Sequence, residues 1–304
     1  MSVLTAPLRQ AWEVDGWCLI EGAVPADQLQ SAQRAVAKLF PSAEDMAGSP
    51  DARDPRWSTW DANWPEFPFR SRTLNSLVVS DLVIDVAAEL LGTDDVRMYL
   101  AIASAKYADQ PSDYNRLLHV DFPNHTLTVP RAEPGYHQVE LFVYLNDVSR
   151  QNGATHFVSR RHTHAIPVEE HTLNLDDYGA LYEDGCDASG PAGSIVVYRP
   201  DVYHRSVDFS DPAQARFMLH VSYKPAGLEW GGYQAWPFKG FSAEWHAFVQ
   251  GASPRQLAVL GFPEPGHVFW TSTTLDGVAR RYPGLDLTPW RSALRSDQGL
   301  RSRD

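Results

Sequence analysis

The chain has 304 residues, of which 43% are hydrophobic and 21% are charged, as in ordinary globular proteins and unlike disordered or fibrous chains. Its net charge of −12 comes without any basic run, which argues against binding to nucleic acid or to an anionic membrane. No apolar run reaches the roughly eighteen residues that a membrane span needs, and the N-terminus lacks a signal-peptide pattern. Two cysteines fit a reducing compartment, so we expect a cytoplasmic protein without a disulfide framework.

The N-terminal part, residues 1–95, is predicted to be a helical and irregular support. A short apolar run at 16–20 indicates a strand, and the apolar spacing within 22–40 and 74–92 is typical of helices. Between these helices, residues 41–75 are rich in Pro, Ser, Asp and Trp. A long irregular segment of this kind often carries function, which makes it a candidate lid.

From Val96 onward the pattern changes to short apolar or alternating runs bounded by turn residues, which indicates strands. These runs are 96–107, 138–145, 155–159, 194–199 and 216–223. Their spacing predicts an antiparallel sandwich or barrel preceded by helices. We therefore expect one domain with a mainly β core over 96–225 and a C-terminal extension over 226–304.

A His-x-Asp pair, His119 and Asp121, is the sharpest local motif. In a strand, side chains two residues apart point to the same face, so both can reach one ion. His204, 85 residues after His119, follows another predicted strand and is the candidate third ligand. Two imidazoles and one carboxylate on one side of a metal leave coordination positions open, as in non-haem iron(II) oxygenases.

Arg216 stands twelve residues after His204 and opens an apolar strand. If His204 ends one strand and Arg216 enters the next, the two lie side by side across a turn. Ser206 lies two residues after His204. A guanidinium fork and a hydroxyl together make a good receptor for a carboxylate, so we predict an anion site here.

Several further motifs stand in a fixed order around these residues. They are the opening 15–25 followed by a helix, Lys106 thirteen residues before His119, the stretch 145–148 followed by Asn152-Gly153, and 193–198 leading to His204, Ser206, Arg216 and Tyr223. In order and spacing they resemble the phytanoyl-CoA dioxygenase family of iron(II)- and 2-oxoglutarate-dependent oxygenases. The resemblance covers roughly residues 10–225 and implies a double-stranded β-helix, a cupin-like jelly roll with flanking helices.

The resemblance implies that iron(II) binds the His-Asp-His set and that 2-oxoglutarate chelates the metal through its keto acid end. It implies that Arg216 and Ser206 hold the far carboxylate of the cosubstrate, with Lys106 and Arg116 as further cosubstrate contacts. The expected reaction with dioxygen hydroxylates an unactivated C–H bond of a small, hydrophobic organic metabolite and releases succinate and CO2. Relatives with Gly or Ala in place of Asp121 are halogenases, so the intact carboxylate disfavours halogenation.

Residues that follow the ligand pair, stand in the candidate lid or enter the Arg216 strand are predicted to contact the substrate. They are Asn124, Tyr136, Gln138, Trp60 and His220. Three alternatives stay open: desaturation, epimerisation or cyclisation by the same machinery, a non-catalytic binding protein, and a cupin-like metal enzyme without cosubstrate. Arg216 with Ser206 argues against the last, because such an enzyme needs no carboxylate clamp. The sequence specifies no oligomeric state.

Overall fold

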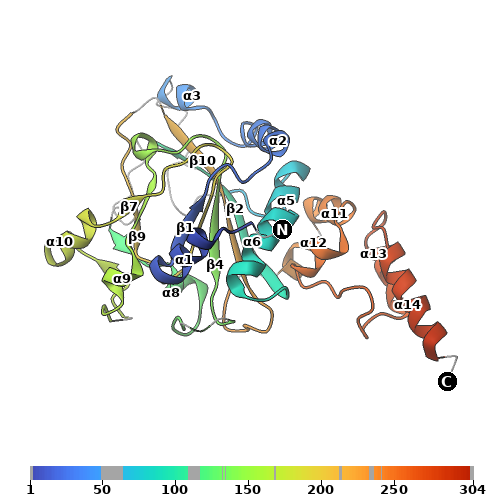
Figure 1. Cartoon of the computed structure of the whole chain (residues 1–304). Coiled ribbons are helices and arrows are strands. Elements are labelled where there is room, and N and C mark those ends of the chain that lie inside the picture. Colours follow the sequence, from blue (N-terminus) through green and yellow to red (C-terminus); the bar gives the residue numbers. More distant parts are fainter. Residues whose placement is uncertain are drawn as a thin grey trace.

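Two antiparallel sheets of five strands each form the centre of the molecule (Figure 1). The computed structural model describes residues 3–48, 64–108, 117–131, 133, 135–167, 169–211, 214–232, 236–240 and 242–301. The major sheet has the order β1 (Trp17–Ile20), β8 (Ile195–Tyr198), β4 (Val139–Tyr144), β10 (Ala215–Pro225) and β2 (Val96–Tyr107). The minor sheet has the order β6 (Thr172–Leu173), β3 (Leu118–His119), β9 (His204–Ser206), β5 (Thr155–Phe157) and β7 (Cys186–Asp187).

Alternation along the strands gives the major sheet two different buried faces. On β4, Leu141 and Val143 point toward the helices, whereas Phe142 and Tyr144 point toward the minor sheet. The two sheets meet there through aromatic packing, in which Phe157 of β5 takes part. We call this second face of the major sheet the interior face; every candidate cosubstrate contact that the structure describes on this sheet lies on it.

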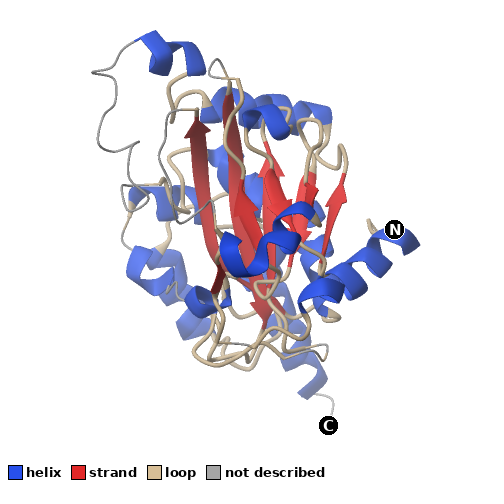
Figure 2. Ribbon diagram, turned by 90° about the vertical axis from the view of Figure 1, so that its left-hand side faces the viewer, coloured by secondary structure: helices blue, strands red, loops and turns tan. Residues whose placement is uncertain are grey.

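Helices cover the other face of the major sheet, and Figure 2 shows the strands at the centre with helices around them. The helix predicted over 74–92 is two helices, α5 (Arg72–Val78) and α6 (Asp81–Leu91). The break follows from Ser80, whose side chain accepts a hydrogen bond from the Val83 N–H and so begins a new helix. The apolar spacing continues through both helices because both contribute buried side chains to the same hydrophobic cluster.

The remaining helices lie around the sheets and outside α5 and α6 (Figure 1). They are α1 (Ala6–Asp15), α2 (Ala26–Val36), α3 (Ala43–Gly48), α8 (Phe122–His125), α9 (Arg160–Thr163), α10 (Leu175–Glu183), α11 (Ala243–Val249), α12 (Pro254–Ala258), α13 (Ser272–Arg281) and α14 (Thr288–Arg301), with short 3-10 turns η2 (Arg150–Asn152) and η3 (Trp236–Lys239). In Figure 1 the C-terminal helices α13 and α14 project to one side of the sheets.

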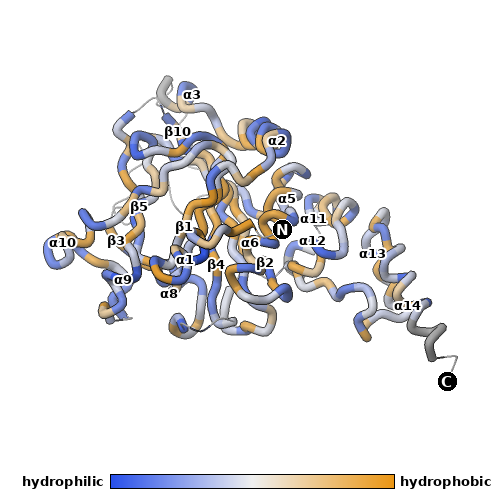
Figure 3. The backbone as a smooth tube through the Cα atoms, viewed as in Figure 1, coloured by the Kyte–Doolittle hydropathy of each residue, from blue (hydrophilic) through white to orange (hydrophobic). Residues whose placement is uncertain are grey.

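The colouring of Figure 3 follows this arrangement, with hydrophobic residues concentrated in the central strands and hydrophilic residues on peripheral elements such as α2. Of the candidate lid, α3 is helical and residues 49–63, which include Trp60, lie outside the described residues. Trp64 packs against a buried group of β2 side chains. Across the part of the chain that the structure describes, we find no helix with the length and apolar character of a membrane span.

Candidate metal centre

The three predicted metal ligands come together at one end of the minor sheet. His119 on β3 and His204 on β9 are directly paired across the two strands, and their ring centroids are 4.5 Å apart. Asp121 places Oδ1 3.8 Å from Nε2 of His119 and Oδ2 3.4 Å from Nε2 of His204. The ligand atoms of all three lie within 4.8 Å of one another, close enough to bind one metal ion.

The backbone geometry that brings the three residues together differs from the predicted one, in which His119 and Asp121 lie on the same face of a strand. Strand β3 ends at His119, and Asp121 adopts a helical backbone conformation as the N-cap residue of α8. Its backbone N–H donates to the Pro200 carbonyl at 2.8 Å, which ties the turn to the segment just before His204. His204 begins β9 rather than ending a strand. The ligand set is therefore assembled by strand pairing and a fixed turn.

Backbone carbonyls orient both imidazoles. Nδ1 of His119 lies 2.8 Å from the Leu117 carbonyl, and Nδ1 of His204 lies 3.0 Å from the Val202 carbonyl. A carbonyl only accepts, so each Nδ1 carries the proton and donates it. Each Nε2 is then unprotonated and lies on the side of the ring that faces Asp121, as metal ligation requires.

Hydrogen bonds and burial also set the charges of the cluster. Burial lowers the pKa of His204 to about 4, against the opposing effect of Asp121, so this imidazole is neutral at pH 7. Burial alone would raise the pKa of Asp121, but the neighbouring imidazoles and the Tyr198 hydroxyl lower it, so the carboxylate is ionised. The Tyr198 hydroxyl donates to Asp121 Oδ2 at 2.7 Å. Burial and the Asp121 charge raise the pKa of Tyr198 well above its ordinary value, so it keeps this proton.

A cationic pair lies farther along the interior face, away from the three ligands. Arg216 on β10 is paired directly with Lys106 on β2, so their side chains share this face. Lys106 donates to the Ser206 hydroxyl and, at 3.2 Å, to the Val207 carbonyl. Arg216 donates to the Gly153 carbonyl. Because His204 and Arg216 belong to facing sheets, the prediction that they lie side by side across a turn is wrong, although Arg216 and Ser206 do converge on one region.

The charge of Arg216 is left uncompensated. Its side chain is buried, with 6% exposed, and its Nε has no hydrogen-bond partner among the described residues. Across the same residues, no carboxylate forms an ion pair with it. Burial lowers its pKa, yet a guanidinium stays charged at any pH that a folded protein meets. A buried charge without a partner is costly, so the region is suited to an anion from outside the chain.

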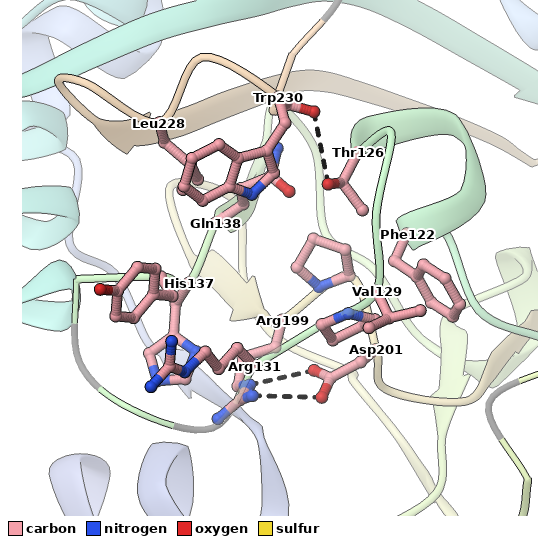
Figure 4. Close-up of a pocket in the computed structure, with 13 residues that line it drawn as sticks. Phe122, Thr126, Val129, Arg131, His137, Gln138, Arg199, Asp201, Leu228 and Trp230 are labelled. Carbon is pink, nitrogen blue, oxygen red and sulfur yellow. Dashed lines mark hydrogen bonds and ion pairs between the residues drawn. The ribbon is translucent and has the colours of Figure 1, made fainter.

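The predicted substrate contacts are distributed unevenly. Tyr136 and Gln138 line a pocket that opens to solvent beside the Asp121 turn. Its other lining residues are Phe122, Thr126, Val129, Pro130, Arg131, His137, Arg199, Pro200, Asp201, Leu228 and Trp230. Figure 4 shows the Arg199–Asp201 ion pair and the Thr126–Trp230 hydrogen bond on its walls. None of the three candidate ligands lines this pocket, which lies beside the centre rather than over it.

The other predicted contacts have different environments. Asn124 is exposed on α8 and is not brought to the centre. Gln138 donates to the His125 carbonyl at 2.8 Å, which supports α8. His220 lies on the interior face. Arg116 and Trp60 lie outside the described residues.

Sequence reasoning did not single out Glu140 or the Tyr198 hydroxyl. Glu140 is fully buried on the interior face and accepts hydrogen bonds from Tyr99, His220 and Ser222. A usable signal was present, because a glutamate inside the apolar run 139–145 must be exposed, paired or functional. Tyr198 offered no such signal, since a tyrosine ending an apolar strand is ordinary.

Comparisons with known proteins agree with this architecture. EctD from S. alaskensis in its apo form is 18% identical, with a TM-score of 0.54, over 77% of this chain and 83% of that one. HygX from Streptomyces hygroscopicus, with nickel and 2-oxoglutarate bound, is 16% identical, with a TM-score of 0.51, over 76% of this chain and 96% of that one. At these identities the likeness is one of fold.

A third similar structure is SnoN, a non-heme alpha ketoglutarate dependent epimerase from nogalamycin biosynthesis. It is 16% identical, with a TM-score of 0.50, over 72% of this chain and 82% of that one. The comparison with curated proteins found no match. The family model described as phytanoyl-CoA dioxygenase (PhyH) matches residues 12–211, most of the chain. The chain belongs to the phytanoyl-CoA dioxygenase (PhyH) family.

Proposed function

We propose that this chain is an iron(II)- and 2-oxoglutarate-dependent dioxygenase that hydroxylates an unactivated C–H bond of a small organic metabolite. Family membership makes it an oxygenase-type enzyme of the iron and 2-oxoglutarate class. The observation that carries the proposal is the combination of a preformed His-Asp-His set with a buried, uncompensated Arg216 on the facing sheet. The two facing antiparallel sheets fit a double-stranded β-helix, and we take this to be the core.

We assign His119, Asp121 and His204 as the metal ligands. Both imidazoles present an unprotonated Nε2, and the carboxylate is ionised, so the donor set matches what iron(II) binds in non-haem oxygenases. Bound there, iron would activate dioxygen in concert with oxidative decarboxylation of 2-oxoglutarate to succinate and CO2. Tyr198 restrains the carboxylate and the two backbone carbonyls restrain the imidazoles, so the chain supplies a fixed geometry.

We assign Arg216, Ser206 and Lys106 to the far carboxylate of 2-oxoglutarate. A dicarboxylate would provide the missing counter-charge for Arg216, whose Nε is free to donate. Lys106 already donates to the Ser206 hydroxyl, which leaves that oxygen's own proton available to a carboxylate. The aromatic packing around this end of the interior face excludes water and strengthens the attraction.

A second reaction on the same machinery, epimerisation, is favoured by one observation, the fold likeness to SnoN. HygX has also been solved with hygromycin B bound, so one neighbour of this fold binds a small organic molecule. Desaturation and cyclisation use the same ligands. We further propose that residues 1–304 form one domain, with 1–95 as support, 96–225 as the catalytic core and 226–304 as a C-terminal extension.

An anaerobic titration tests the cofactor assignment. Metal-free protein receives iron(II) and then 2-oxoglutarate, and the weak visible charge-transfer band of the chelate is recorded. We expect the band in the wild type and its loss in His204→Ala. His164→Ala is the control and should keep the band, because His164 is an exposed histidine outside the His-Asp-His set. Iron binding without the band would contradict the cosubstrate site and favour a cosubstrate-independent cupin-like protein.

Product analysis under ¹⁸O₂ then separates the reaction types. Hydroxylation places one ¹⁸O atom in the product, whereas epimerisation, desaturation and ring closure between existing groups place none. Unlabelled product formed together with stoichiometric succinate would contradict hydroxylation and support one of these alternatives.

A further inference from the structure

A buried polar network lies on the interior face beside the metal centre. At its middle is Glu140, whose side chain is fully buried. Oε1 accepts from the Tyr99 hydroxyl at 2.6 Å and lies 3.1 Å from Nδ1 of His125. Oε2 lies 2.8 Å from Nε2 of His220 and accepts from the Ser222 hydroxyl. Four groups thus converge on one carboxylate that the proposed cofactor chemistry does not use.

The charge state of Glu140 follows from its partners. Burial alone would raise its pKa, but His125 and the surrounding hydrogen bonds hold the pKa of Glu140 well below its ordinary value. The carboxylate is therefore ionised and can only accept hydrogen bonds. Consequently the proton of the His220 contact is on Nε2. In the neutral imidazole, Nδ1 of His220 is then a hydrogen-bond acceptor.

Nδ1 of His220 is the open end of this network. Within the ranges that the structure describes, it has no hydrogen-bond partner. The His220 side chain keeps 14% of its surface accessible, whereas that of Glu140 has none. A network that served packing alone would satisfy every polar group. Here one acceptor is held in a fixed orientation and left free.

The surroundings of His220 place it next to the expected substrate. It shares the interior face of β10 with Arg216, four residues away, and its ring centroid lies 6.4 Å from that of His125, at the end of the helix α8 that Asp121 caps. Its direct cross-strand neighbours are Phe142 on β4 and Ile102 on β2, both apolar. The Phe142 ring packs edge-on against the imidazole at 4.9 Å between centroids. The free acceptor thus stands between apolar walls near the metal centre.

We propose that Nδ1 of His220, positioned by Glu140, accepts a hydrogen bond from the substrate and selects molecules that carry a hydroxyl or amino group on an otherwise apolar skeleton. This inference rests on the proposed function, because it places the substrate beside the proposed iron site. His220 is a specificity-determining residue and Glu140 is a positioning residue that fixes its tautomer and ring plane.

Matched small probes test the proposal. The pairs are cyclohexanol with methoxycyclohexane, and cyclohexylammonium with N,N,N-trimethylcyclohexylammonium; each pair differs in the presence of a donor hydrogen. Binding is followed under anaerobic conditions by the change that each probe causes in the visible band of the iron and 2-oxoglutarate complex. We expect the wild type to bind the donor member about threefold to tenfold more tightly, the range for one net hydrogen bond.

Variants identify the acceptor. His220→Phe should abolish the preference while the band itself persists, and His220→Gln, which keeps an acceptor, should retain most of it. Equal binding of both members by the wild type, no response to either donor probe, or an unchanged preference in His220→Phe would overturn the proposal. Loss of the band in the wild type would instead refute the proposed function, so the two failures are distinguishable.

A ¹⁵N spectrum of the zinc-loaded protein gives a readout independent of the probes. We expect the His220 imidazole, identified by its absence in His220→Gln, to carry its proton on Nε2. In Glu140→Gln the His220 proton should no longer be restricted to Nε2, because the amide can donate as well as accept. A proton on Nδ1 of His220 in the wild type would overturn the proposal.

Discussion

Removal of the Tyr198 hydroxyl tests how strongly the metal centre depends on a partner outside the ligand set. In Tyr198→Phe the ring that packs between the sheets is kept, and only the donor to Asp121 Oδ2 at 2.7 Å is lost. A hydrogen bond to a charged group contributes about 1.5–3 kcal/mol. Loss of one partner that orients a metal ligand lowers metal affinity by about 10–100-fold, which corresponds to about 1.4–2.7 kcal/mol. The two ranges agree, so we expect iron(II) binding to weaken by about 10–100-fold.

The assay is an anaerobic competition for iron(II) between the protein and a chromophoric chelator. Tyr223→Phe is the matched control, because Tyr223 is also fully buried in the major sheet, and its hydroxyl donates at 2.9 Å to the Val78 carbonyl among the helices. The control should bind iron as the wild type does. An affinity of Tyr198→Phe within twofold of the wild type would refute the argument that this hydroxyl orients Asp121.

Three further changes have defined outcomes. Arg216→Met should raise the KM for 2-oxoglutarate by on the order of 100-fold. It should also raise the melting temperature of the cosubstrate-free protein, because an uncompensated buried charge is removed. Unchanged values of both would show that the carboxylate binds elsewhere. Asp121→Gly should abolish succinate-coupled product formation, and retained hydroxylation would contradict the ligand set. Glu140→Gln should lower the melting temperature most between about pH 4.5 and 6.5. Because the pKa of Glu140 is lowered by folding, the stabilisation from its ion pair with His125 decreases as the pH falls below that window. Because the pKa of His125 is raised, the stabilisation also decreases as the pH rises above the window. A difference in melting temperature between wild type and variant that does not change with pH would contradict the ion pair.

The strands of the major sheet were predictable from sequence, whereas most strands of the minor sheet were not. The run 96–107 coincides with β2, and 216–223 lies within β10, because a long alternating or apolar run has few other interpretations. The minor sheet is built from strands such as β3 and β6 of two residues each, too short to show any periodicity. Their positions follow from pairing partners distant in the chain, and no local pattern encodes such pairing.

The convergence of His119, Asp121 and His204 was predictable because their chemical types are uncommon and their spacing is specific. The structure brings Asp121 to the two histidines as predicted, but the predicted strand geometry is wrong, since the residue caps a helix. Asn124, chosen for its proximity in sequence, is exposed, because α8 turns its side chain outward. Proximity along the chain is therefore a weaker guide to the site than residue chemistry.

The interior face of the major sheet carries opposite charges at its two ends. Arg216, which was predicted from the sequence, and Glu140, which was not, are therefore parts of one surface. At one end Arg216 and Lys106 are paired across strands, and at the other end Glu140 collects the hydrogen bonds of its neighbours. Arg216 forms no ion pair with a described carboxylate, so it is suited to an anion from outside the chain, which is the cosubstrate in our proposal. A carboxylate that is fully partnered requires nothing, and its effect is to direct the free nitrogen of His220. In our proposals the cationic end recognises the cosubstrate by its charge, and the anionic end positions His220 to recognise the substrate through a single hydrogen bond.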